Sequence, residues 1–315
     1  MNNKCKVTVA VISYNPVWEK LRNTLKSIVW QKNVDFEIIV ADDGSEHDSF
    51  DKVEQYLKEK KITNYRLVKN PINQGIVKNV LSAVNVAQGK YIKLISPGDF
   101  LYDENTLHEF VDFAEKNPAA FYFGNMFYYS LDTNDRILTY TDKKNPRDLR
   151  PWKKHNIKKI RKNYLVDCDY ICGAVCMYNT EKLAKYLTEI SSFVSYAEDC
   201  SMIYMIANNE NCCYINTRGG VWYEFGFGIS TKKNEAWNNR IRNDNKNLFV
   251  HLLEKNLIPT WNYKLLFSDS KTERRLLRLI HYPQSYLRKV FSKNEVKGYE
   301  DIECDINKLK KILEQ

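Results

Sequence analysis

The first 130 residues alternate between short apolar runs and segments with helical spacing, and this alternation limits the folds open to the chain. The runs at 6–13, 36–41 and 91–95 are mainly apolar without regular polar alternation, which is typical of strands buried on both faces. The segments 18–30 and 73–87 repeat their apolar residues at the spacing of a helix. Buried strands separated by helices predict a parallel sheet that helices cover on both faces.

Beyond residue 130 the pattern is less regular. Residues 131–163 are polar and basic, and they predict an insertion or a long connection. A strand-like pattern follows at 166–178, and a loop rich in glycine and aromatic residues is expected at 219–231. From residue 237 onward the spacing is helical.

Composition places the chain among globular proteins. Of its 315 residues, 43% are apolar and 28% are charged, which is too apolar for a disordered chain. No run approaches the ~18 uninterrupted apolar residues of a membrane-spanning helix. Because the N-terminus also lacks the features of a signal peptide, we expect a cytoplasmic protein with reduced cysteines.

Acidic residues follow two of the expected strands. Ligands of parallel sheets bind at the carboxyl ends of the strands, so these positions are candidate site residues. Asp43 follows one strand and can accept a hydrogen bond from a nucleobase or a ribose, or serve only as a turn residue. Asp99 follows another strand and can help to hold a divalent cation on phosphate oxygens, or stabilise a turn.

A third acidic cluster, Glu198-Asp199, precedes a helical segment. Carboxylates at this position cap a helix and interact favourably with its dipole. In a cleft beside a hydroxyl group, the same carboxylates can act as a general base. The sequence contains no GxGxxG, Walker A, GxSxG or HExxH pattern. It therefore lacks the motifs of dinucleotide-binding, P-loop, serine-hydrolase and zinc-protease sites.

Part of the net charge of +9 lies in the segment 271–297, which contains eight basic residues and two acidic ones. Large apolar residues interleave with these charges, so the segment predicts either a packed helix pair or an element that lies on an anionic membrane. A second basic run at 153–162 is expected to be a solvated surface. Since no recognition motif for nucleic acid accompanies the charge, we expect no nucleic-acid partner.

Five motifs in order carry a family resemblance: VTVAVISYN (7–15), IIVADDGS (38–45), NQG (73–75), AQGKYIKLISPGD (87–99) and the pair Glu198-Asp199. Together they resemble the family 2 inverting glycosyltransferases of the GT-A fold over about residues 5–230. The resemblance implies an α/β fold with a Rossmann-like, mixed and mostly parallel sheet. It also implies a transferase domain at 1–235, with a donor half at 1–130 and an acceptor half at 131–235, and a basic helical extension at 236–315.

The resemblance also implies roles for single residues. Donor-binding residues are expected at Ser13, Tyr14, Asn15, Asp43, Asn73, Gly75, Lys78, Ser96 and Asp99. Asp43 corresponds to the residue that binds base and ribose, and Asp99 to the one where Mn or Mg bridges the diphosphate. Asp199 corresponds to the catalytic base, with Glu198 and Gly173 beside it on the acceptor side.

The sequence departs from the family pattern at two places. Ser96 and Gly98 stand where relatives carry carboxylates, and a single carboxylate holds a cation less firmly. The arginine that many relatives carry after the NxG motif is replaced by Val80. We therefore expect other cations to face the diphosphate, with Arg218, Lys232 and Lys233 as candidates.

The function that follows from the resemblance is transfer of a hexose or N-acetylhexosamine from a nucleotide-sugar, with UDP as the first choice. The expected acceptor is a hydroxyl of a glycan, glycolipid or glycoprotein in the synthesis of a bacterial surface polysaccharide. A lipid-linked acceptor would place the protein on the inner face of the cell membrane through 271–297. Alternatives are a nucleotidyltransferase and a non-catalytic carbohydrate-binding protein with a decayed GT-A site.

Overall fold

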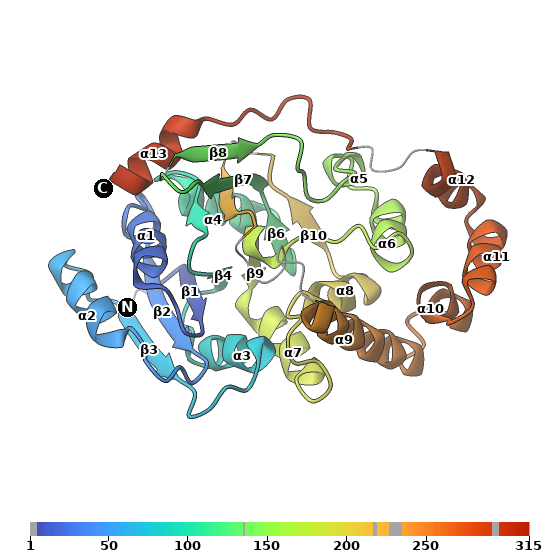
Figure 1. The fold of residues 1–315 in the computed structure, drawn as a ribbon, viewed down its shortest axis with the longest axis horizontal. Coiled ribbons are helices and arrows are strands. Elements are labelled where there is room, and N and C mark those ends of the chain that lie inside the picture. Colours follow the sequence, from blue (N-terminus) through green and yellow to red (C-terminus); the bar gives the residue numbers. More distant parts are fainter. Residues whose placement is uncertain (1–4, 135, 217–218, 227–234, 292–295, 315) are drawn as a thin grey trace.

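The computed structural model describes residues 5–134, 136–216, 219–226, 235–291 and 296–314 (Figure 1). Strands of these residues form a seven-stranded sheet in the order β10-β6-β9-β4-β1-β2-β3. Their bounds are Val7–Ser13 (β1), Phe36–Asp42 (β2), Tyr65–Lys69 (β3), Tyr91–Ile95 (β4), Phe121–Phe123 (β6), Cys176–Asn179 (β9) and Cys212–Tyr214 (β10). Strand β1 pairs in parallel with β2 and β4, whereas β9 runs antiparallel to both of its neighbours. The predicted mixed, mostly parallel sheet is thus confirmed.

The side chains of β1 show why its sequence is apolar on both faces. Val7, Val9 and Val11 pack in one hydrophobic cluster with residues of helix α1 (Trp18–Val29). Ala10 faces the opposite cluster, which includes residues of helix α3 (Ile76–Val86). The strand is therefore buried on both sides, as its lack of polar alternation predicts.

A second, smaller sheet has the strand order β5-β11-β7-β8. Its strands are Phe100–Leu101 (β5), Asn125–Leu131 (β7), Ile137–Tyr140 (β8) and Gly220–Glu224 (β11). The expectation of a loop at 219–231 is wrong for residues 220–224, because β11 pairs with β7 and β5 and buries Trp222 against Tyr102. The strand-like pattern at 166–178 yields a strand only from Cys176, after a short 3-10 turn at Gly173–Val175.

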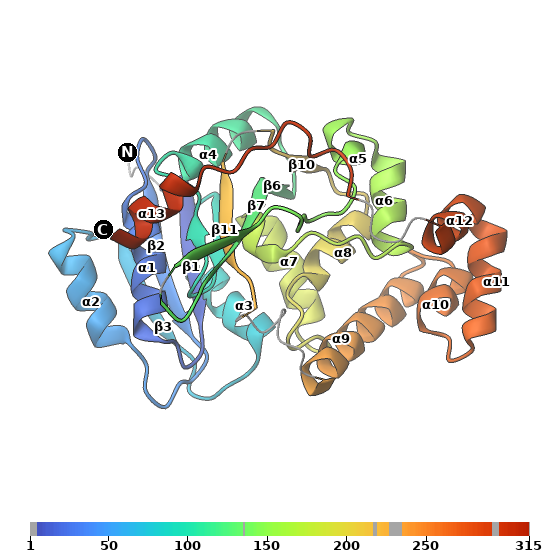
Figure 2. The same ribbon diagram turned by 45° about the horizontal axis from the view of Figure 1, so that its top comes forward.

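Helices flank the main sheet (Figure 2). Besides α1 and α3, they are Phe50–Glu59 (α2), Thr106–Lys116 (α4), Thr180–Ile190 (α7) and Cys200–Ala207 (α8). The segment 131–163, which we expected to be an insertion or a long connection, contains β8 and the helices Arg150–Lys153 (α5) and Ile157–Leu165 (α6). Trp152 and Tyr164 of these helices are buried in the core, so the segment is integrated into the fold.

The C-terminal part is helical, as expected. Its helices are Glu235–Glu254 (α9), Thr260–Phe267 (α10), Lys271–His281 (α11), Pro283–Phe291 (α12) and Ile306–Glu314 (α13). Figure 1 shows α10–α12 at one end of the molecule, whereas α13 returns to lie near α1. Leu309 and Ile312 of α13 pack with Phe100 and Trp222. The boundary at 235–236 stays a prediction, and no helix of the described residues is long and apolar enough to cross a membrane.

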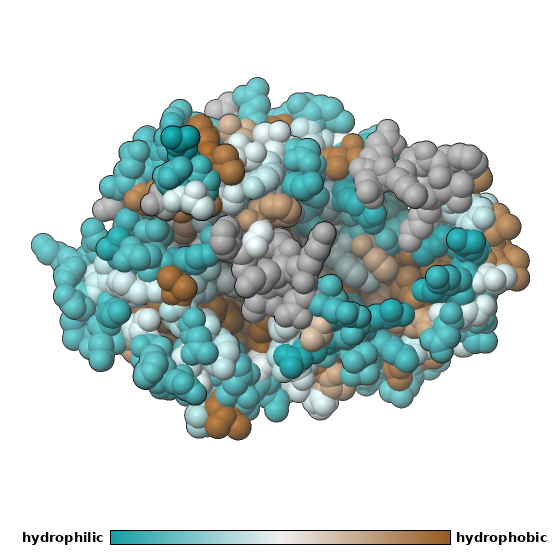
Figure 3. Space-filling view, in the orientation of Figure 1, coloured by the Kyte–Doolittle hydropathy of each residue, from teal (hydrophilic) through white to brown (hydrophobic). Residues whose placement is uncertain are grey.

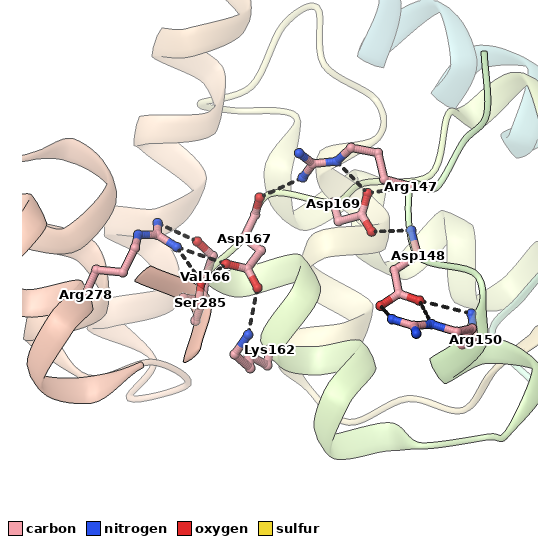
Figure 4. A network of polar contacts seen from close by, with 9 residues as sticks. All are labelled: Arg147, Asp148, Arg150, Lys162, Val166, Asp167, Asp169, Arg278 and Ser285. Carbon is pink, nitrogen blue, oxygen red and sulfur yellow. Dashed lines mark hydrogen bonds and ion pairs between the residues drawn. The ribbon is translucent and has the colours of Figure 1, made fainter. Parts of the chain in front are cut away.

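A buried ion pair connects α11 and α12 to residues 166–167 (Figure 4). Arg278 of α11 contacts the Asp167 carboxylate at 2.9 Å and donates to the Val166 carbonyl oxygen at 2.9 Å. Lys162 lies 2.7 Å from the other Asp167 oxygen, and Ser285 of α12 also contacts this carboxylate. Arg278 is therefore not part of the basic surface that we expected at 271–297, because its charge is buried and paired.

Replacing Arg278 by alanine removes these contacts while leaving Asp167 paired only with Lys162 and Ser285. We expect the Arg278→Ala variant to lose about 2 kcal/mol of unfolding free energy and to become sensitive to proteolysis around α11 and α12. Arg275→Ala is the matched control, because Arg275 lies on the same helix and is exposed. Thermal denaturation and limited proteolysis measure both effects; equal behaviour of the two variants would contradict the anchoring role of Arg278.

Candidate functional site

A cavity of about 650 Å³ opens at the carboxyl ends of the parallel strands. Predicted site residues from distant parts of the chain line it together: Ser13, Tyr14, Asn15, Asp43, Ser96, Asp99, Gly173, Glu198 and Asp199. Figure 3 shows recessed apolar side chains, in brown, beside the centre of the molecule. The topology thus brings together residues that the sequence separates by more than a hundred positions.

The buried carboxylate of Asp43 links two of the sequence motifs. Its oxygens accept hydrogen bonds from the backbone N–H groups of Gln74 and Gly75, at 3.0 and 2.9 Å, and from the side chain of Asn70 at 3.0 Å. Gly44 has a φ of +74°, and a Cβ there would lie 2.5 Å from the backbone of Ile72. The DDGS turn and the NQG segment are therefore packed as one unit at the edge of the sheet.

The NQG segment does not itself line the cavity, whereas Ile76, Asn79 and Val80 of the helix that follows it do. Asn73 and Lys78 are exposed, while Gly75 is buried and acts through its hydrogen bond to Asp43. The donor-binding roles of these three residues stay predictions. Arg218, Lys232 and Lys233, the other candidate cations, lie outside the described residues.

Asp99 lies at the end of β4, where burial raises the pKa of its carboxyl to about 7. Its Oδ1 atom accepts a hydrogen bond from the backbone N–H of Glu224 at 3.2 Å. Within the described ranges, no three His, Cys, Asp or Glu side chains are grouped so that they could hold a metal ion. Glu224, another carboxylate that lines the cavity, is bound to Lys20. A cation at Asp99 would therefore have to take most of its oxygen ligands from a diphosphate and water, and the Mn or Mg role of Asp99 stays a prediction.

The Glu198-Asp199 pair lies at the start of α8 and lines the same cavity as Asp43. A Cβ atom on residue 173 would lie 2.3 Å from Asp199 Oδ1, so the close approach of this carboxylate requires Gly173. Asp199 Oδ1 is buried and has no hydrogen-bond partner among the described residues. A carboxylate oxygen held in this way is available to accept a proton from a bound molecule.

Burial raises the pKa of both Glu198 and Asp199 above the ordinary carboxylate range. The negative charge of Asp199 raises the pKa of Glu198 further, whereas the backbone of Gly173 favours the ionised form of Asp199. Asp199 is therefore the first of the two to ionise as the pH rises. Its neighbour then stays protonated, since two adjacent buried charges would repel.

Sequence reasoning missed several residues that line the cavity: Lys20, Tyr196, Glu224, Trp237, Asn238 and Asn245. Tyr196 is only two residues before Glu198, so its position in the chain was a usable signal. Its ring packs edge-on against Trp237 of α9, with centroids 5.3 Å apart. Nothing in the helical spacing of α9 marks Trp237 as a cavity residue.

Asp244 of α9 positions the loop before the acidic pair. This buried carboxylate accepts hydrogen bonds from three consecutive backbone N–H groups, those of Ser195, Tyr196 and Ala197, at 3.2, 2.6 and 3.0 Å. The Ser195 carbonyl oxygen in turn accepts a hydrogen bond from the Val77 N–H of α3 at 3.0 Å. The loop is thus held from both sides, and α9 contributes directly to the geometry of the cavity.

The two sheets, with a ligand cavity at the carboxyl ends of the parallel strands, define the GT-A class of α/β proteins. The sequence profile described as glycosyl transferase family 2 matches residues 8–187. This match covers more than half of the chain, and the chain belongs to this family.

Individual proteins agree with this assignment. An uncharacterized glycosyltransferase of Methanocaldococcus jannaschii is 26% identical over 164 residues, which cover 51% of this chain and 52% of the relative. The chain thus aligns with about half the length of that curated relative. S. aureus TarS 1–349 in complex with UDP-GlcNAc has a TM-score of 0.54 at 17% identity, covering 98% of this chain and 80% of that one. The complex of TarS 1–349 with UDP has a TM-score of 0.50 at 16% identity, and the match covers 91% of this chain and 81% of that one. At sequence identities this low, the similarity to TarS shows a shared fold only.

Removing the Asp244 carboxylate leaves the three N–H groups of residues 195–197 without their acceptor. We expect Asp244→Ala to accelerate amide hydrogen exchange in this loop by about tenfold or more, because hydrogen bonds to a charged acceptor are lost. Exchange in β2 serves as the internal reference and is expected to stay unchanged. Equal acceleration in both segments would indicate general destabilisation instead of loosening of this loop.

Proposed function

We propose that the protein is an inverting glycosyltransferase that moves a hexosyl or N-acetylhexosaminyl group from a UDP-sugar to an acceptor hydroxyl. The observation that carries this proposal is that Asp43, Asp99 and Asp199 line one cavity in a chain of glycosyl transferase family 2. The structures of S. aureus TarS with UDP and UDP-GlcNAc support a UDP-sugar as the donor.

On the donor side, Ser13, Tyr14 and Asn15 at the end of β1 lie beside Asp43, and we propose that they hold the nucleoside. The exposed ring of Tyr14 offers a face on which a base can stack. Asn15 has a φ of 45°, and its backbone N–H donates to the Ser45 hydroxyl at 2.7 Å. This turn therefore has a fixed shape before a ligand enters.

On the acceptor side, Asp199 is proposed as the general base. It takes the proton of the acceptor hydroxyl while that oxygen forms a bond to the anomeric carbon. The bond from this carbon to the donor phosphate breaks in the same step, and its electron pair leaves with the nucleoside diphosphate. One displacement inverts the anomeric configuration and needs no covalent nucleophile on the protein.

We also propose that the acceptor is lipid-linked, for a bacterial surface glycan, and that the protein works on the cytoplasmic face of the membrane. Leu276, Leu279 and Ile280 of α11 are 53, 45 and 61% exposed, and Lys271 and Arg275 lie on the same helix. Apolar side chains are visible at the edge of the molecule over α11 (Figure 3). An exposed apolar face with basic neighbours suits the interface of an anionic bilayer.

The catalytic proposal is tested by measuring nucleotide release from UDP-glucose, UDP-GlcNAc and other nucleotide-sugars with an acceptor present. We expect Asp199→Asn to lower kcat by about 10²- to 10⁴-fold, the usual contribution of a general base, while UDP binding is retained. In the wild type, kcat/KM should rise with pH as the raised pKa of Asp199 is passed, and the asparagine variant should lose this rise.

The matched control is Glu198→Gln, which mimics the protonated form of Glu198 and should keep both activity and the pH profile within a few-fold. Wild-type turnover by Asp199→Asn would contradict the role of the base. Binding of nucleotide-sugars without any release would instead favour the non-catalytic alternative.

The membrane proposal predicts co-sedimentation with vesicles that contain anionic lipid and weak binding to neutral ones. Leu276→Ser/Ile280→Ser should reduce binding, because apolar burial in the interface contributes to the affinity. Arg278→Ala is unsuitable here because that side chain is buried. Equal binding to neutral and anionic vesicles would contradict the electrostatic part of the proposal.

A further inference from the structure

An ion pair occupies the corner of the cavity next to Asp99. Lys20 in the first turn of α1 contacts both oxygens of Glu224, the last residue of β11, at 2.7 and 2.6 Å. Both side chains line the cavity, and they are 35 and 12% exposed. Neither residue belongs to a motif that the sequence marks as functional.

The position of Glu224 is tied to a departure in the acidic motif. Gly98 stands where the resemblance leads us to expect a carboxylate, and its φ is +103°. A Cβ atom on residue 98 would lie only 2.6 Å from Glu224 Oε2. The carboxylate of Glu224 thus fills the space that a side chain at 98 would enter, and it brings the positively charged Lys20 with it.

We propose that Lys20 binds the diphosphate of the donor and supplies the positive charge for which the acidic motif of relatives uses a cation. The proposal rests on the proposed function, and it assigns the ligand of this corner as a nucleoside diphosphate. Glu224 is a positioning residue, since it holds the lysine side chain at the cavity wall. An incoming phosphate oxygen offers Lys20 an anionic partner of the same kind as the carboxylate that it already contacts.

Two further features favour an anion here. Helix α1 begins at the cavity, where Pro16 and Val17 also form part of the wall, so its positive dipole end adds to the charge of Lys20. Asp99 is only about half ionised at neutral pH, because burial raises its pKa to about 7. The negative charge in this corner therefore repels a diphosphate less strongly than two fully ionised carboxylates would.

The proposal is tested by titration calorimetry with UDP and with uridine, each in EDTA and again with Mn. The informative comparison is Glu224→Gln against the double variant Lys20→Met/Glu224→Gln, because the glutamine avoids an unpaired buried charge when the lysine is removed. We expect the double variant to bind UDP about tenfold or more weakly than Glu224→Gln, in EDTA as well as in Mn. Uridine affinity should be equal in both, which also shows that the pocket is folded.

Two further variants sharpen the result. Lys20→Arg keeps the charge and should keep UDP affinity within a few-fold, whereas Lys20→Met should not. Lys58→Met is the matched control, since Lys58 is exposed on α2 and paired with Glu54.

Equal UDP affinity with and without Lys20, or loss of wild-type UDP binding in EDTA, would overturn the proposal while leaving the proposed function intact. If the wild type binds neither UDP nor any other nucleoside diphosphate, the proposed function fails as well.

Discussion

The hydrogen bonds of the Asp43 carboxylate hold together the parts on which the cavity depends. They fix the backbone at Gln74 and Gly75, just before α3 begins. Gly75 packs so closely on Ser195 that a Cβ atom would lie 2.6 Å from its carbonyl oxygen. From Ser195 the contacts continue to Asp244 of α9. A continuous set of backbone contacts thus connects the strand end that is proposed to bind the nucleoside with the loop that precedes the proposed base.

This arrangement places the charged groups of the cavity in different environments. Asp43 accepts hydrogen bonds from two backbone N–H groups and from the Asn70 side chain, and Glu224 is neutralised by Lys20. Asp199 has a buried oxygen without a partner, and burial favours its protonated form. Carboxylates with satisfied hydrogen bonds stabilise the structure, whereas one that is left unsatisfied is typical of a functional site.

Much of the fold could be predicted because its signals are local. The parallel strands follow from apolar runs, and Asp43 and Asp99 follow from the rule that ligands bind at strand ends. The pairing of Lys20 with Glu224 could not be predicted, since the two residues are 204 positions apart and meet only when β11 joins the second sheet. The burial of Arg278 was missed for the same reason, because helical spacing does not reveal a partner such as Asp167 in another element. The roles within the cavity come from the resemblance and stay predictions until they are measured.

The return of α13 to the second sheet has a consequence for synthesis of the protein. Leu309 and Ile312 complete an aromatic cluster with Phe100, Tyr102 and Trp222, residues that adjoin the corner formed by Asp99 and Glu224. During translation the N-terminal strands can pair long before these two residues leave the ribosome. The apolar side of β5 and β11 therefore stays uncovered until residues 309–312 have been made. The nascent protein would complete this corner of its cavity only after residues 131–235 and α9 have been made.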